Sequence, residues 1–466
     1  MTTRYDAVVL GAGLAGLSAA TQLAERGLGV LVVEARPAAG GRATAFADSH
    51  TGDRVDNGQH ALFGCYHEAL RFLRRVGAEG SVRVQPDLAV DLILPDGRAS
   101  RLVCPPLPSP LHLAAAVLDW DVLPWRDRAS VLRMRKPLAR AKALLRKPGG
   151  VAAASPSETV AQWLVRNGQA PRLISWLWEP LALAALNQSI YVAAAVPFAR
   201  ILALMFGGDR RDAALVMPTR PLDEMYVTPA LEFLRQRGGE VRTGSPARIF
   251  VGEDGSARVT AGGQTISAPV VISAVPWFEL PQVLAAVPAL APVVHAASRT
   301  VASPIVTVNL WFDRAVFGRS VVGLPGRTMQ WAFEKPSVVG DGCVHVSLVS
   351  SGADDMLALA NDRLAALALA EVIAAVPRAS AATLRRSLVV RERRATFSLA
   401  PDQPSRPNTR TGVRGLFLAG DWIETGLPAT LEGAALSGHQ AAAAATISER
   451  APASLLSRID RTGPAT

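Results

Sequence analysis

The sequence predicts an α/β protein in which three separated segments build one nucleotide-binding domain and a second, α+β domain is inserted between them. Three observations indicate this fold. A short apolar strand, a glycine-rich turn and a helix follow one another at residues 5–26. Short β-rich runs alternate with glycine turns at residues 240–276. A strand, a Gly-Asp turn and an Ala-rich helix lie at residues 415–450, so both ends of the chain carry nucleotide-fold elements.

The N-terminal segment opens with a βαβ unit whose first turn reads GAGLAG. In this GxGxxG pattern Gly11 permits the tight turn, Gly13 lets the backbone approach a pyrophosphate, and Gly16 lets helix and strand pack closely. The helix that starts at Leu14 and Ala15 offers free N–H groups and a positive dipole end to phosphates. We therefore expect a Rossmann-type dinucleotide site.

The second strand, GVLVVE, ends at Glu34 and leads into the stretch EARPAAGGRATAF. A carboxylate at that place accepts hydrogen bonds from a ribose diol and repels a 2′-phosphate. Two glycines then make a second close approach, and an arginine offers a fork for phosphate oxygens, which NAD dehydrogenases do not need. These features favour FAD. The cofactor-binding residues predicted from this segment are Gly11, Gly13, Leu14, Ala15, Gly16, Glu34, Ala35, Arg36, Gly40, Gly41 and Arg42.

The C-terminal segment adds a carboxylate and a helix N-terminus to the predicted FAD site. In AGD, Gly420 precedes Asp421 at a strand end, where the carboxylate can reach a ribityl hydroxyl. The helix that begins near Leu431 can aim its N–H groups at the pyrimidine edge of a flavin and stabilise negative charge there. The C-terminal and mid-chain residues assigned to FAD are Gly420, Asp421, Thr430, Leu431, Ala434 and Arg248.

Taken together, GxGxxG…E…GGR at one end and AGD…EGA…SG at the other resemble the superfamily of FAD-dependent amine oxidases and carotenoid desaturases. The resemblance covers nearly the whole chain, and the mid-chain VVISAVP also matches. Within that superfamily, DNGQHALFGCY (56–66) and LWEPLALAALN (177–187) look most like the hydroxysqualene dehydroxylases, the squalene-associated FAD-dependent desaturases. The resemblance implies an amine oxidase/phytoene desaturase-like fold. It also implies a bacterial enzyme of squalene and hopanoid synthesis that replaces the hydroxyl of hydroxysqualene by hydride from reduced FAD.

The organisation of the chain follows from these segments. We expect the FAD-binding domain to comprise residues 1–76, 227–276 and 415–450, the substrate domain to comprise residues 77–226 and 277–414, and a loose tail to follow at residues 451–466.

The segment DNGQH supplies the candidate catalytic residues. In the superfamily a glycine after the GGR arm passes close to the flavin ring, and Gly58 is the matching position; Gln59 and His60 would then lie beside the isoalloxazine. We hypothesise that His60 donates a proton to the leaving hydroxyl or positions the group that does. Asp56 would orient the loop or keep the imidazole protonated. In the alternative, Asp56 and Asn57 satisfy loop N–H groups and His60 is a core histidine bonded to backbone.

Other side chains are weaker candidates for the substrate site. Glu179 is a charge amid apolar residues, so it acts as the acid if burial raises its pKa, or it is paired with an arginine. Cys65 and Tyr66 are interpreted as packing residues, with Tyr66 a runner-up candidate for the acid. Four tryptophans either line an apolar tunnel and stabilise a cation or belong to the core: Trp176, Trp178, Trp311 and Trp331.

Composition limits the class of protein. Of 466 residues 49% are hydrophobic and 19% charged, which indicates a well-buried globular protein. Three scattered cysteines without CxxC argue against a disulfide framework or a zinc site, and we predict no metal. The N-terminus lacks a secretory signal pattern. The uncharged stretch 180–199 is broken by prolines and polar residues, so no membrane span is expected.

The net charge of +10 is concentrated in one window. Between Arg126 and Lys147 there are nine Lys/Arg and one acid, with Leu138, Ala141 and Leu145 at helical spacing. Such a segment is typical of an interfacial helix on an anionic membrane, although a solvated helix face is the plainer alternative. No nucleic-acid motif accompanies it. A C30 isoprenoid substrate lives in lipid, so we expect a cytoplasmic protein held peripherally on the inner membrane.

Two rival functions remain open at this point. The first is an oxidising enzyme of the same fold, a carotenoid-type desaturase or an amine oxidase, although the flavin-facing lysine and aromatic cage of amine oxidases cannot be placed in the sequence. The second is a non-catalytic isoprenoid-binding protein, which would not need the complete set of flavin motifs. The electron donor for FAD, the lipid, the direction of hydride flow and the oligomeric state stay open.

Overall fold

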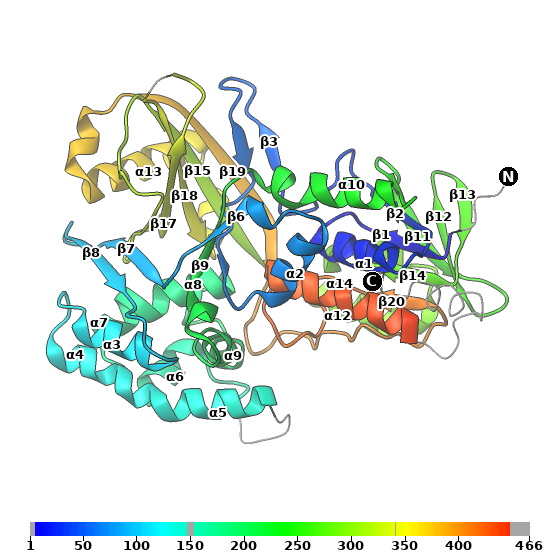
Figure 1. The fold of residues 1–466 in the computed structure, drawn as a ribbon, viewed down its shortest axis with the longest axis horizontal. Helices are drawn as coiled ribbons and strands as arrows, with labels where there is room; N and C mark the ends of the chain where they lie inside the picture. The colour runs from blue at the N-terminus through cyan, green and yellow to red at the C-terminus, as the bar shows by residue number, and fades with distance from the viewer. Residues whose placement is uncertain (1–4, 147–152, 341, 448–466) are drawn as a thin grey trace, which may run out of the picture.

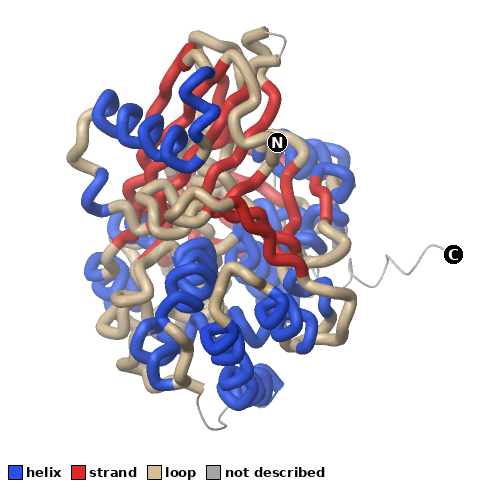
Figure 2. The backbone as a smooth tube through the Cα atoms, turned by 90° about the vertical axis from the view of Figure 1, so that its left-hand side faces the viewer, coloured by secondary structure: helices blue, strands red, loops and turns tan. Residues whose placement is uncertain are grey.

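The structure, a computed structural model, describes residues 5–146, 153–340 and 342–447. Figure 1 shows an elongated molecule, with the nucleotide-binding part at the right and the substrate-side part at the left. The left part divides into a strand-rich portion above and a helical portion below, and Figure 2 shows the same division from the side. The predicted tail at 451–466 and Lys147 lie outside the described residues.

A five-stranded parallel sheet in the order β10-β2-β1-β14-β20 forms the nucleotide-binding part. The strands β1, β2 and β14 are buried throughout, as expected for a parallel sheet covered on both faces. Because its strands come from all three predicted segments, the sheet confirms the predicted fold class, whereas the exact domain bounds stay a prediction. The strands are β1 (Ala7–Leu10), β2 (Val30–Val33), β10 (Glu240–Arg242), β14 (Val270–Ser273) and β20 (Leu416–Leu418).

Helices α1, α10 and α14 accompany this sheet, and α1 packs along α14. A three-stranded antiparallel sheet made of the mid-chain β-rich runs lies beside it. The helices are α1 (Leu14–Glu25), α10 (Thr228–Gln236) and α14 (Leu431–Ile447), and the antiparallel strands are β11 (Ala247–Val251), β12 (Ala257–Ala261) and β13 (Gln264–Ser267).

A seven-stranded sheet in the order β19-β15-β18-β17-β16-β7-β8 forms the upper substrate-side portion. In β15 the even-numbered side chains, such as Val306 and Leu310, pack with α13 into one apolar cluster. The odd-numbered side chains therefore face the opposite way, toward the nucleotide-binding part. The elements are β7 (Ala89–Ile93), β8 (Ala99–Val103), β15 (Ala302–Phe312), β16 (Val321–Gly323), β17 (Trp331–Pro336), β18 (Val344–Ser351), β19 (Leu384–Phe397) and α13 (Asn361–Ala375).

The lower substrate-side portion is helical and contains the basic window. Leu138 and Leu145 of α5 are half-buried and Ala141 is buried, and all three pack against the main core next to α9. The expected membrane-facing apolar stripe of α5 is thus wrong: that stripe is the helix's core contact. The helices are α3 (Leu111–Asp119), α4 (Trp125–Ala129), η2 (Ser130–Met134), α5 (Arg135–Arg146), α6 (Val160–Arg166), α7 (Pro171–Leu173), η3 (Ile174–Trp178), α8 (Glu179–Leu186) and α9 (Ala195–Met205).

In the part of the chain that the structure describes, no helix combines the length and the apolarity that crossing a bilayer requires. Nor do those residues include a group of three His, Cys, Asp or Glu side chains placed to hold a metal ion. The three cysteines are free thiols.

Short elements connect the two parts of the molecule. The hairpin β3–β4 and helix α2 follow the glycine arm, and β5 and β6 pair with β9 from the helical portion. Their bounds are β3 (Ala45–Ala47), β4 (Arg54–Asp56), β5 (Leu62–Phe63), α2 (His67–Arg75), β6 (Val82–Val84), β9 (Leu215–Pro218), the π-helix η5 (Asp223–Val227), α11 (Leu280–Val283) and α12 (Ala291–Arg299).

Candidate active site

A large cavity of about 500 Å³ runs from the N-terminal glycine turn to the substrate-side sheet and helices. One end, which we name the cofactor end, is walled mostly by glycines, backbone and a few charged groups. Of the residues predicted to bind FAD, the cavity brings together Gly11, Gly13, Leu14, Ala15, Glu34, Ala35, Arg36, Gly40, Gly41, Arg42, Gly58, Gln59, Gly420, Asp421, Thr430, Leu431 and Ala434.

The glycines of the cofactor end have backbone geometries that side chains would spoil. Gly11 has φ +96°, and a Cβ there would lie 2.9 Å from the Ala274 carbonyl oxygen. The two glycine turns meet, since a Cβ on Gly41, at φ +63°, would lie 3.0 Å from Gly13 Cα. Gly13 itself is extended (φ −78°, ψ 179°), and a Cβ there would lie 3.7 Å from Gly41 Cα, an ordinary contact distance. This cradle of bare backbone fits a pyrophosphate.

Glu34 is fixed in place before any ligand arrives. Its carboxylate accepts the Ala12 N–H at 2.7 Å and the Arg36 N–H at 2.9 Å. A carboxylate has about four lone-pair sites, so the side chain keeps acceptors for a ribose diol. The residues of the cavity wall therefore fit the adenosine half of FAD.

Arg42 and Asp421 contact each other across the cofactor end. The guanidinium pairs with the Asp421 carboxylate at 2.5 Å and donates to the Ala395 carbonyl oxygen at 2.8 Å. It also lies 5.3 Å from the ring centre of Trp277. Arg42 thus joins the first and third nucleotide-binding segments to strand β19. The two residues of this ion pair are the ones predicted to contact FAD, Arg42 at a phosphate and Asp421 at a ribityl hydroxyl.

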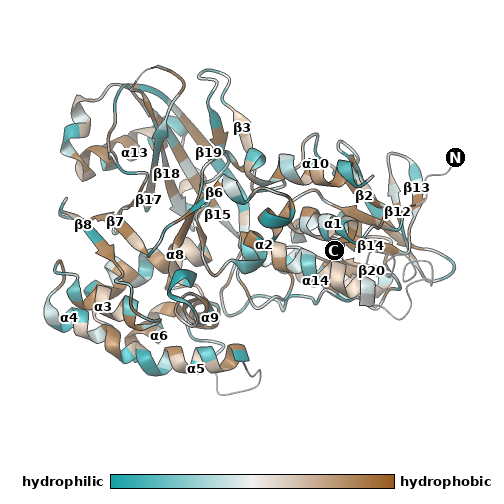
Figure 3. Cartoon of the chain, viewed as in Figure 1, coloured by the Kyte–Doolittle hydropathy of each residue, from teal (hydrophilic) through white to brown (hydrophobic). Residues whose placement is uncertain are grey.

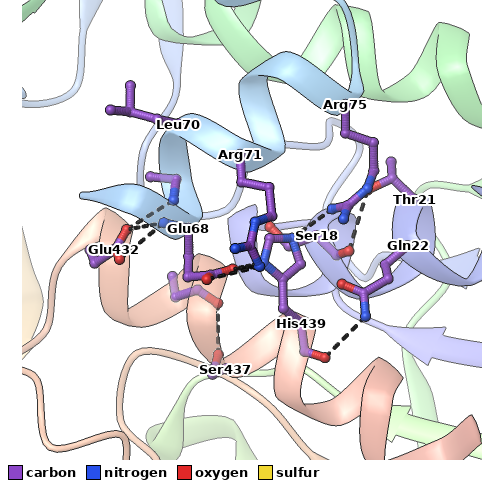
Figure 4. Close-up of polar contacts among 12 residues, drawn as sticks. Ser18, Thr21, Gln22, Glu68, Leu70, Arg71, Arg75, Glu432, Ser437 and His439 are labelled. Atoms are coloured by element: carbon purple, nitrogen blue, oxygen red, sulfur yellow. Dashed lines mark hydrogen bonds and ion pairs between the residues drawn. The ribbon is translucent and has the colours of Figure 1, made fainter. Parts of the chain in front are cut away.

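The N-terminus of α14 faces the cavity with Thr430 and Ala434, while its Glu432 turns the other way (Figure 4). The Glu432 carboxylate accepts the backbone N–H groups of Glu68 and Ala69 at 2.9–3.0 Å and so caps helix α2. Burial raises the pKa of Glu432, and these backbone hydrogen bonds oppose the rise. Sequence reasoning missed this cap, which ties α2 to the flavin-side helix.

The same cluster continues through His439, which lies about two turns after Glu432 on α14 (Figure 4). His439 Nδ1 contacts the Glu68 carboxylate at 2.6 Å, and Arg75 Nη1 lies 2.7 Å from Nε2. Because arginine can only donate, Nε2 is the acceptor and Nδ1 carries the hydrogen. Burial lowers the pKa of His439, so the ring is neutral and its hydrogen bonds join α2 to α14.

Three predicted site residues do not line the cavity. Gly16 is a packing glycine, because a Cβ there would lie 1.9 Å from the Gly11 carbonyl oxygen. Arg248 is exposed on β11, although its neighbours Ser245 and Ala247 do line the cavity. Asp56 is buried and accepts the Leu222 N–H at 3.0 Å.

The DNGQH segment is held by backbone contacts. Asn57 accepts the Thr44 N–H at 3.2 Å and donates to the Arg42 carbonyl oxygen. Asp56 lies 3.8 Å from Lys335 Nζ in addition to its bond with Leu222. The structure therefore favours the loop-satisfying interpretation of Asp56 and Asn57.

His60 lines the cavity, and its Nδ1 lies 2.7 Å from the Gly58 carbonyl oxygen. A carbonyl only accepts, so Nδ1 carries the hydrogen. Burial lowers the pKa of His60, against the opposing effects of the Gly58 carbonyl and the Asp56 carboxylate. The ring is thus neutral near pH 7, with its Nε2 lone pair as the remaining polar group.

Two further carboxylates, which sequence reasoning missed, clamp the β3–β4 hairpin to the seven-stranded sheet. Asp48 pairs with Arg386 at 2.7 Å, and this hydrogen bond holds the pKa of Asp48 well below its usual range. Asp53 accepts from Trp311 Nε1, Ser337 Oγ and the Val338 N–H. Burial raises the pKa of Asp53, but these hydrogen bonds together lower it further than burial raises it.

The opposite end of the cavity, which we name the apolar end, is walled by side chains of the substrate-side elements. Trp176 and Trp178 line it from the π-helix η3, and π-turns often occur at functional sites. The apolar wall is contributed by Leu88, Val90, Leu92, Leu102, Leu113, Trp176, Leu177, Trp178, Leu181, Ala184, Met205, Phe206, Ile305, Trp331, Phe333 and Val349.

The remaining candidates from the sequence divide between wall and core. Trp331 lines the cavity, whereas Trp311 is buried away from it and stacks on His345 with ring centres 4.3 Å apart. Glu179 is half-buried outside the cavity wall, and burial raises its pKa. Tyr66 lines the cavity; burial raises the pKa of its hydroxyl, and a hydrogen bond with Thr430 opposes that rise only in part.

Asn187, which ends the LWEPLALAALN motif, is a structural junction on the cavity wall. It has φ +51°, a left-handed conformation that asparagine adopts more readily than most other residues. Its amide donates to the Ser303 carbonyl oxygen and to Thr396, and its carbonyl accepts the Gly352 N–H, each at 3.0 Å. The motif therefore joins α8 to strands β15 and β19.

Comparison with known proteins agrees with this site. The family model described as flavin containing amine oxidoreductase matches residues 14–446. The hydroxysqualene dehydroxylase of Sinorhizobium fredii is 31% identical over 454 residues, covering 93% of this chain and 96% of that protein. The hydroxysqualene dehydroxylase of Rhodopseudomonas palustris is 32% identical over 450 residues, with the same shares covered.

Among solved structures, cyclohexylamine oxidase from Brevibacterium oxydans is similar, with a TM-score of 0.66 and 18% identity. The match covers 95% of this chain and 99% of that one, and it bears on the fold alone. The glycine cradle, the fixed Glu34 and the helix N-terminus of α14 supply what FAD requires, and the family match spans almost the whole chain. The chain belongs to the family of flavin-containing amine oxidoreductases, and it is an oxidoreductase whose cofactor is FAD.

Proposed function

We propose that this flavoenzyme is a hydroxysqualene dehydroxylase of squalene and hopanoid synthesis. The observation that carries the proposal is the continuity of the cavity, which leads from an FAD-fitting glycine cradle to a long apolar end. Relatives with that activity in their names, at 31% and 32% identity over nearly the full length, support it.

The reaction balances with groups that this proposal names. Reduced FAD supplies the hydride, the carbon–oxygen bond breaks, a carbon–hydrogen bond forms, and the hydroxyl leaves as water after it takes a proton. An allylic alcohol ionises more readily than an isolated one, but hydroxide is a poor leaving group and needs an acid. The apolar end excludes water, which would otherwise capture the cation.

Two side chains of the cavity wall, His60 and Tyr66, can serve the departing hydroxyl. Neutral His60 offers only a lone pair at Nε2, so it can donate a proton only after it takes one up. Tyr66 keeps its hydrogen at neutral pH because burial raises its pKa, and it contacts Thr430 at the flavin-side helix. We propose that protonated His60 is the acid and that Tyr66 hydrogen-bonds the hydroxyl.

A second candidate function has one specific observation in its favour. The Nε2 lone pair of His60 suits removal of a proton from the substrate, which a desaturase requires when FAD accepts the hydride. The zeta-carotene desaturase of Solanum lycopersicum is 25% identical over 483 residues. An assay in both directions separates the two functions.

The test uses the FAD-loaded enzyme, reduced chemically and kept anaerobic, mixed with hydroxysqualene. The proposal expects flavin to reoxidise as squalene appears in a one-to-one ratio. Reduced flavin that stays reduced, while oxidised enzyme desaturates a C30 or C40 isoprenoid, would assign the second function instead.

We also propose that the surface around α4 and η2 docks the enzyme on the cytoplasmic face of the inner membrane, with an anionic bilayer as its partner. Large apolar side chains are exposed there, with Trp125 67%, Leu111 59% and Leu132 54% accessible. The basic residues Arg126 of α4, Arg133 of η2, and Arg135 and Lys136 at the start of α5 are exposed as well. Figure 3 shows this mixture along the lower edge of the molecule, in α3, α4 and α5.

Flotation with vesicles tests this surface. Phosphatidylglycerol vesicles should bind the wild type at low salt and release it at high salt, since each basic residue contributes about 1 kcal/mol near an anionic surface. Trp125→Ser together with Leu132→Ser should weaken binding about tenfold, because each exposed side chain loses its insertion. Val338→Ser removes an equally exposed side chain (73%) elsewhere and should change nothing. Equal binding to phosphatidylcholine vesicles would contradict the proposal.

A further inference from the structure

On the face of the seven-stranded sheet that lies toward the cavity, side chains of neighbouring strands stand side by side in rows that cross the strands. In one row Thr307 of β15 stands beside Val349 of β18, which stands beside Trp331 of β17. In the next row Asn309 stands beside Ser347, which stands beside Phe333. Trp331, Val349 and Phe333 line the cavity, so the polar pair of the second row lies at the margin of its roof.

The polar pair has no exposure of its own. Asn309, Ser347 and His345 are each 0% accessible, and Gln59 of the DNGQH segment contacts Ser347. Buried polar groups are costly unless they are hydrogen-bonded, so these side chains are expected to pair with one another. Which group donates and which accepts can be assigned by starting from a backbone carbonyl, which can only accept.

The chain of hydrogen bonds begins at the Leu388 carbonyl oxygen, which accepts from Asn309 Nδ2 at 3.4 Å. Asn309 Oδ1 therefore points the other way, where it accepts from Ser347 Oγ at 2.7 Å and contacts His345 Nε2 at 2.8 Å. His345 stacks on Trp311, which Asp53 holds in place. Asn309 is thus fixed from three sides.

These hydrogen bonds also determine how Ser347 contacts Gln59. Because the hydrogen of Ser347 is given to Asn309, the serine oxygen has only lone pairs left for Gln59. The Gln59 Nε2 group donates to that oxygen at 3.2 Å. Its carbonyl oxygen has no hydrogen-bond partner among the described residues, and Gln59 lines the cavity.

We propose that Asn309 and Ser347 are positioning residues that lock the amide of Gln59 with its carbonyl oxygen toward the flavin in the cavity. The inference rests on the proposed function only for its kinetic readout. A fixed acceptor there stabilises an N–H group of the reduced flavin or the hydroxyl hydrogen of a bound alcohol. A freely rotating amide would present its NH₂ group half of the time.

The test is a double-mutant cycle on the FAD-loaded enzyme, with Ser347→Ala, Gln59→Leu and both together. One readout needs no substrate, namely the midpoint potential of the bound FAD. Ser347→Ala should lower the reduction equilibrium constant about tenfold, which is about 30 mV for two electrons. In the Gln59→Leu background the same change should produce no shift, because its effect passes through Gln59.

The matched control is Thr307→Val, which removes a buried hydroxyl one row away that makes no hydrogen bond. It should leave the potential unchanged. If Ser347→Ala does not bind FAD, Ser347→Cys takes its place, since the thiol keeps the shape and is a weaker acceptor. An equal shift in both backgrounds, or none in either, would overturn the proposal.

The kinetic readout separates this inference from the proposed function. Under the proposed function Ser347→Ala should lower kcat on hydroxysqualene about tenfold with KM little changed, and only when Gln59 is present. If the wild type shows no dehydroxylation while the coupling in potential persists, the proposed function fails and the positioning role stands.

Discussion

The two ends of the cavity are built by different means. The cofactor end consists of bare backbone and a few fixed charges, and its residues come from short motifs that are each contiguous in sequence. The apolar end is walled by side chains from the seven-stranded sheet, including β7 and β8, and from α3, η3, α8 and α9, which are spread along the chain from Leu88 to Val349. The difference teaches that the cofactor end is built from local motifs of the chain, whereas the apolar end depends on the whole fold.

The largest expected effect tests the glycines, where the two roles of a small residue can be separated. Gly16→Ala should destabilise the protein by more than about 3 kcal/mol, because overpacking against backbone has no relief. Gly13→Ala should fold normally, since its Cβ would meet nothing closer than 3.7 Å. FAD affinity should nevertheless fall tenfold to a hundredfold, because the added methyl group crowds the phosphates and costs about 1–3 kcal/mol of binding free energy. Thermal melting and FAD titration measure the two effects, and melting temperatures that change equally would contradict the distinction.

The next effect tests the junction between the ends. His60→Ala should lower kcat/KM on hydroxysqualene about a hundredfold if protonated His60 is the acid. Because burial lowers the pKa of His60, the active form becomes populated only as pH falls below 6.5, and kcat/KM should rise in that direction. The profile of His60→Gln should be flat over the same range. A rate that falls with pH in the wild type would instead mean that His60 acts as a base.

A smaller effect concerns the Asp48–Arg386 pair, which clamps the β3–β4 hairpin to the seven-stranded sheet. Asp48→Asn should destabilise the protein by about 2 kcal/mol, the usual loss for a hydrogen bond to a charged partner. Since the pKa of Asp48 in the folded protein lies below 3.8, its stabilisation is complete well above 3.8 and is progressively lost as pH falls below 3.8 toward the lower pKa of the folded state. Denaturation by urea at pH 7 and pH 3 should show the difference shrinking. A constant difference would exclude the ion pair with Arg386 as its source.

The smallest effect concerns the cap between α14 and α2. Glu432→Ala should cost about 1 kcal/mol, as for other lost N-caps, and Glu432→Gln should cost less because the amide oxygen still accepts. Burial raises the pKa of Glu432 above 4.5, so its ionised form opposes folding, and the wild type should gain stability relative to Glu432→Gln as pH falls toward 4.5. Matched urea titrations check the order. Glu432→Gln falling below Glu432→Ala would show that the charge itself is required.

The sequence could predict most of the cofactor end from short-range rules, whereas Gly58 and Gln59 were assigned through the family resemblance. Gly11, Gly13 and Glu34 are recognisable from spacing alone, since turn geometry and strand ends fix them locally. Arg248 was assigned to FAD without a motif that defines it, and β11 turns its side chain to solvent. The apolar stripe of α5 was misassigned because periodicity shows that a helix has an apolar face but not what covers it.

The clamp and the cap were not predictable for a related reason. Asp48 and Arg386 are far apart in the sequence, and so are Glu432 and Glu68, so only the folded chain brings them together. The same holds for Asn309, Ser347 and Gln59, whose roles depend on strand register and on a loop from the other part of the molecule. Long-range pairing leaves no mark in a single sequence.

The most direct measurement of the shared cavity uses Ala184→Trp, which places a large side chain in the apolar end at a wall residue with room beside it. Flavin absorption is followed while hydroxysqualene in detergent micelles is added to wild type and variant. We expect both to carry FAD in equal amount, and only the wild type to show a spectral change on addition of the isoprenoid. An unchanged response in the variant, or a loss of FAD along with it, would contradict one cavity with two ends.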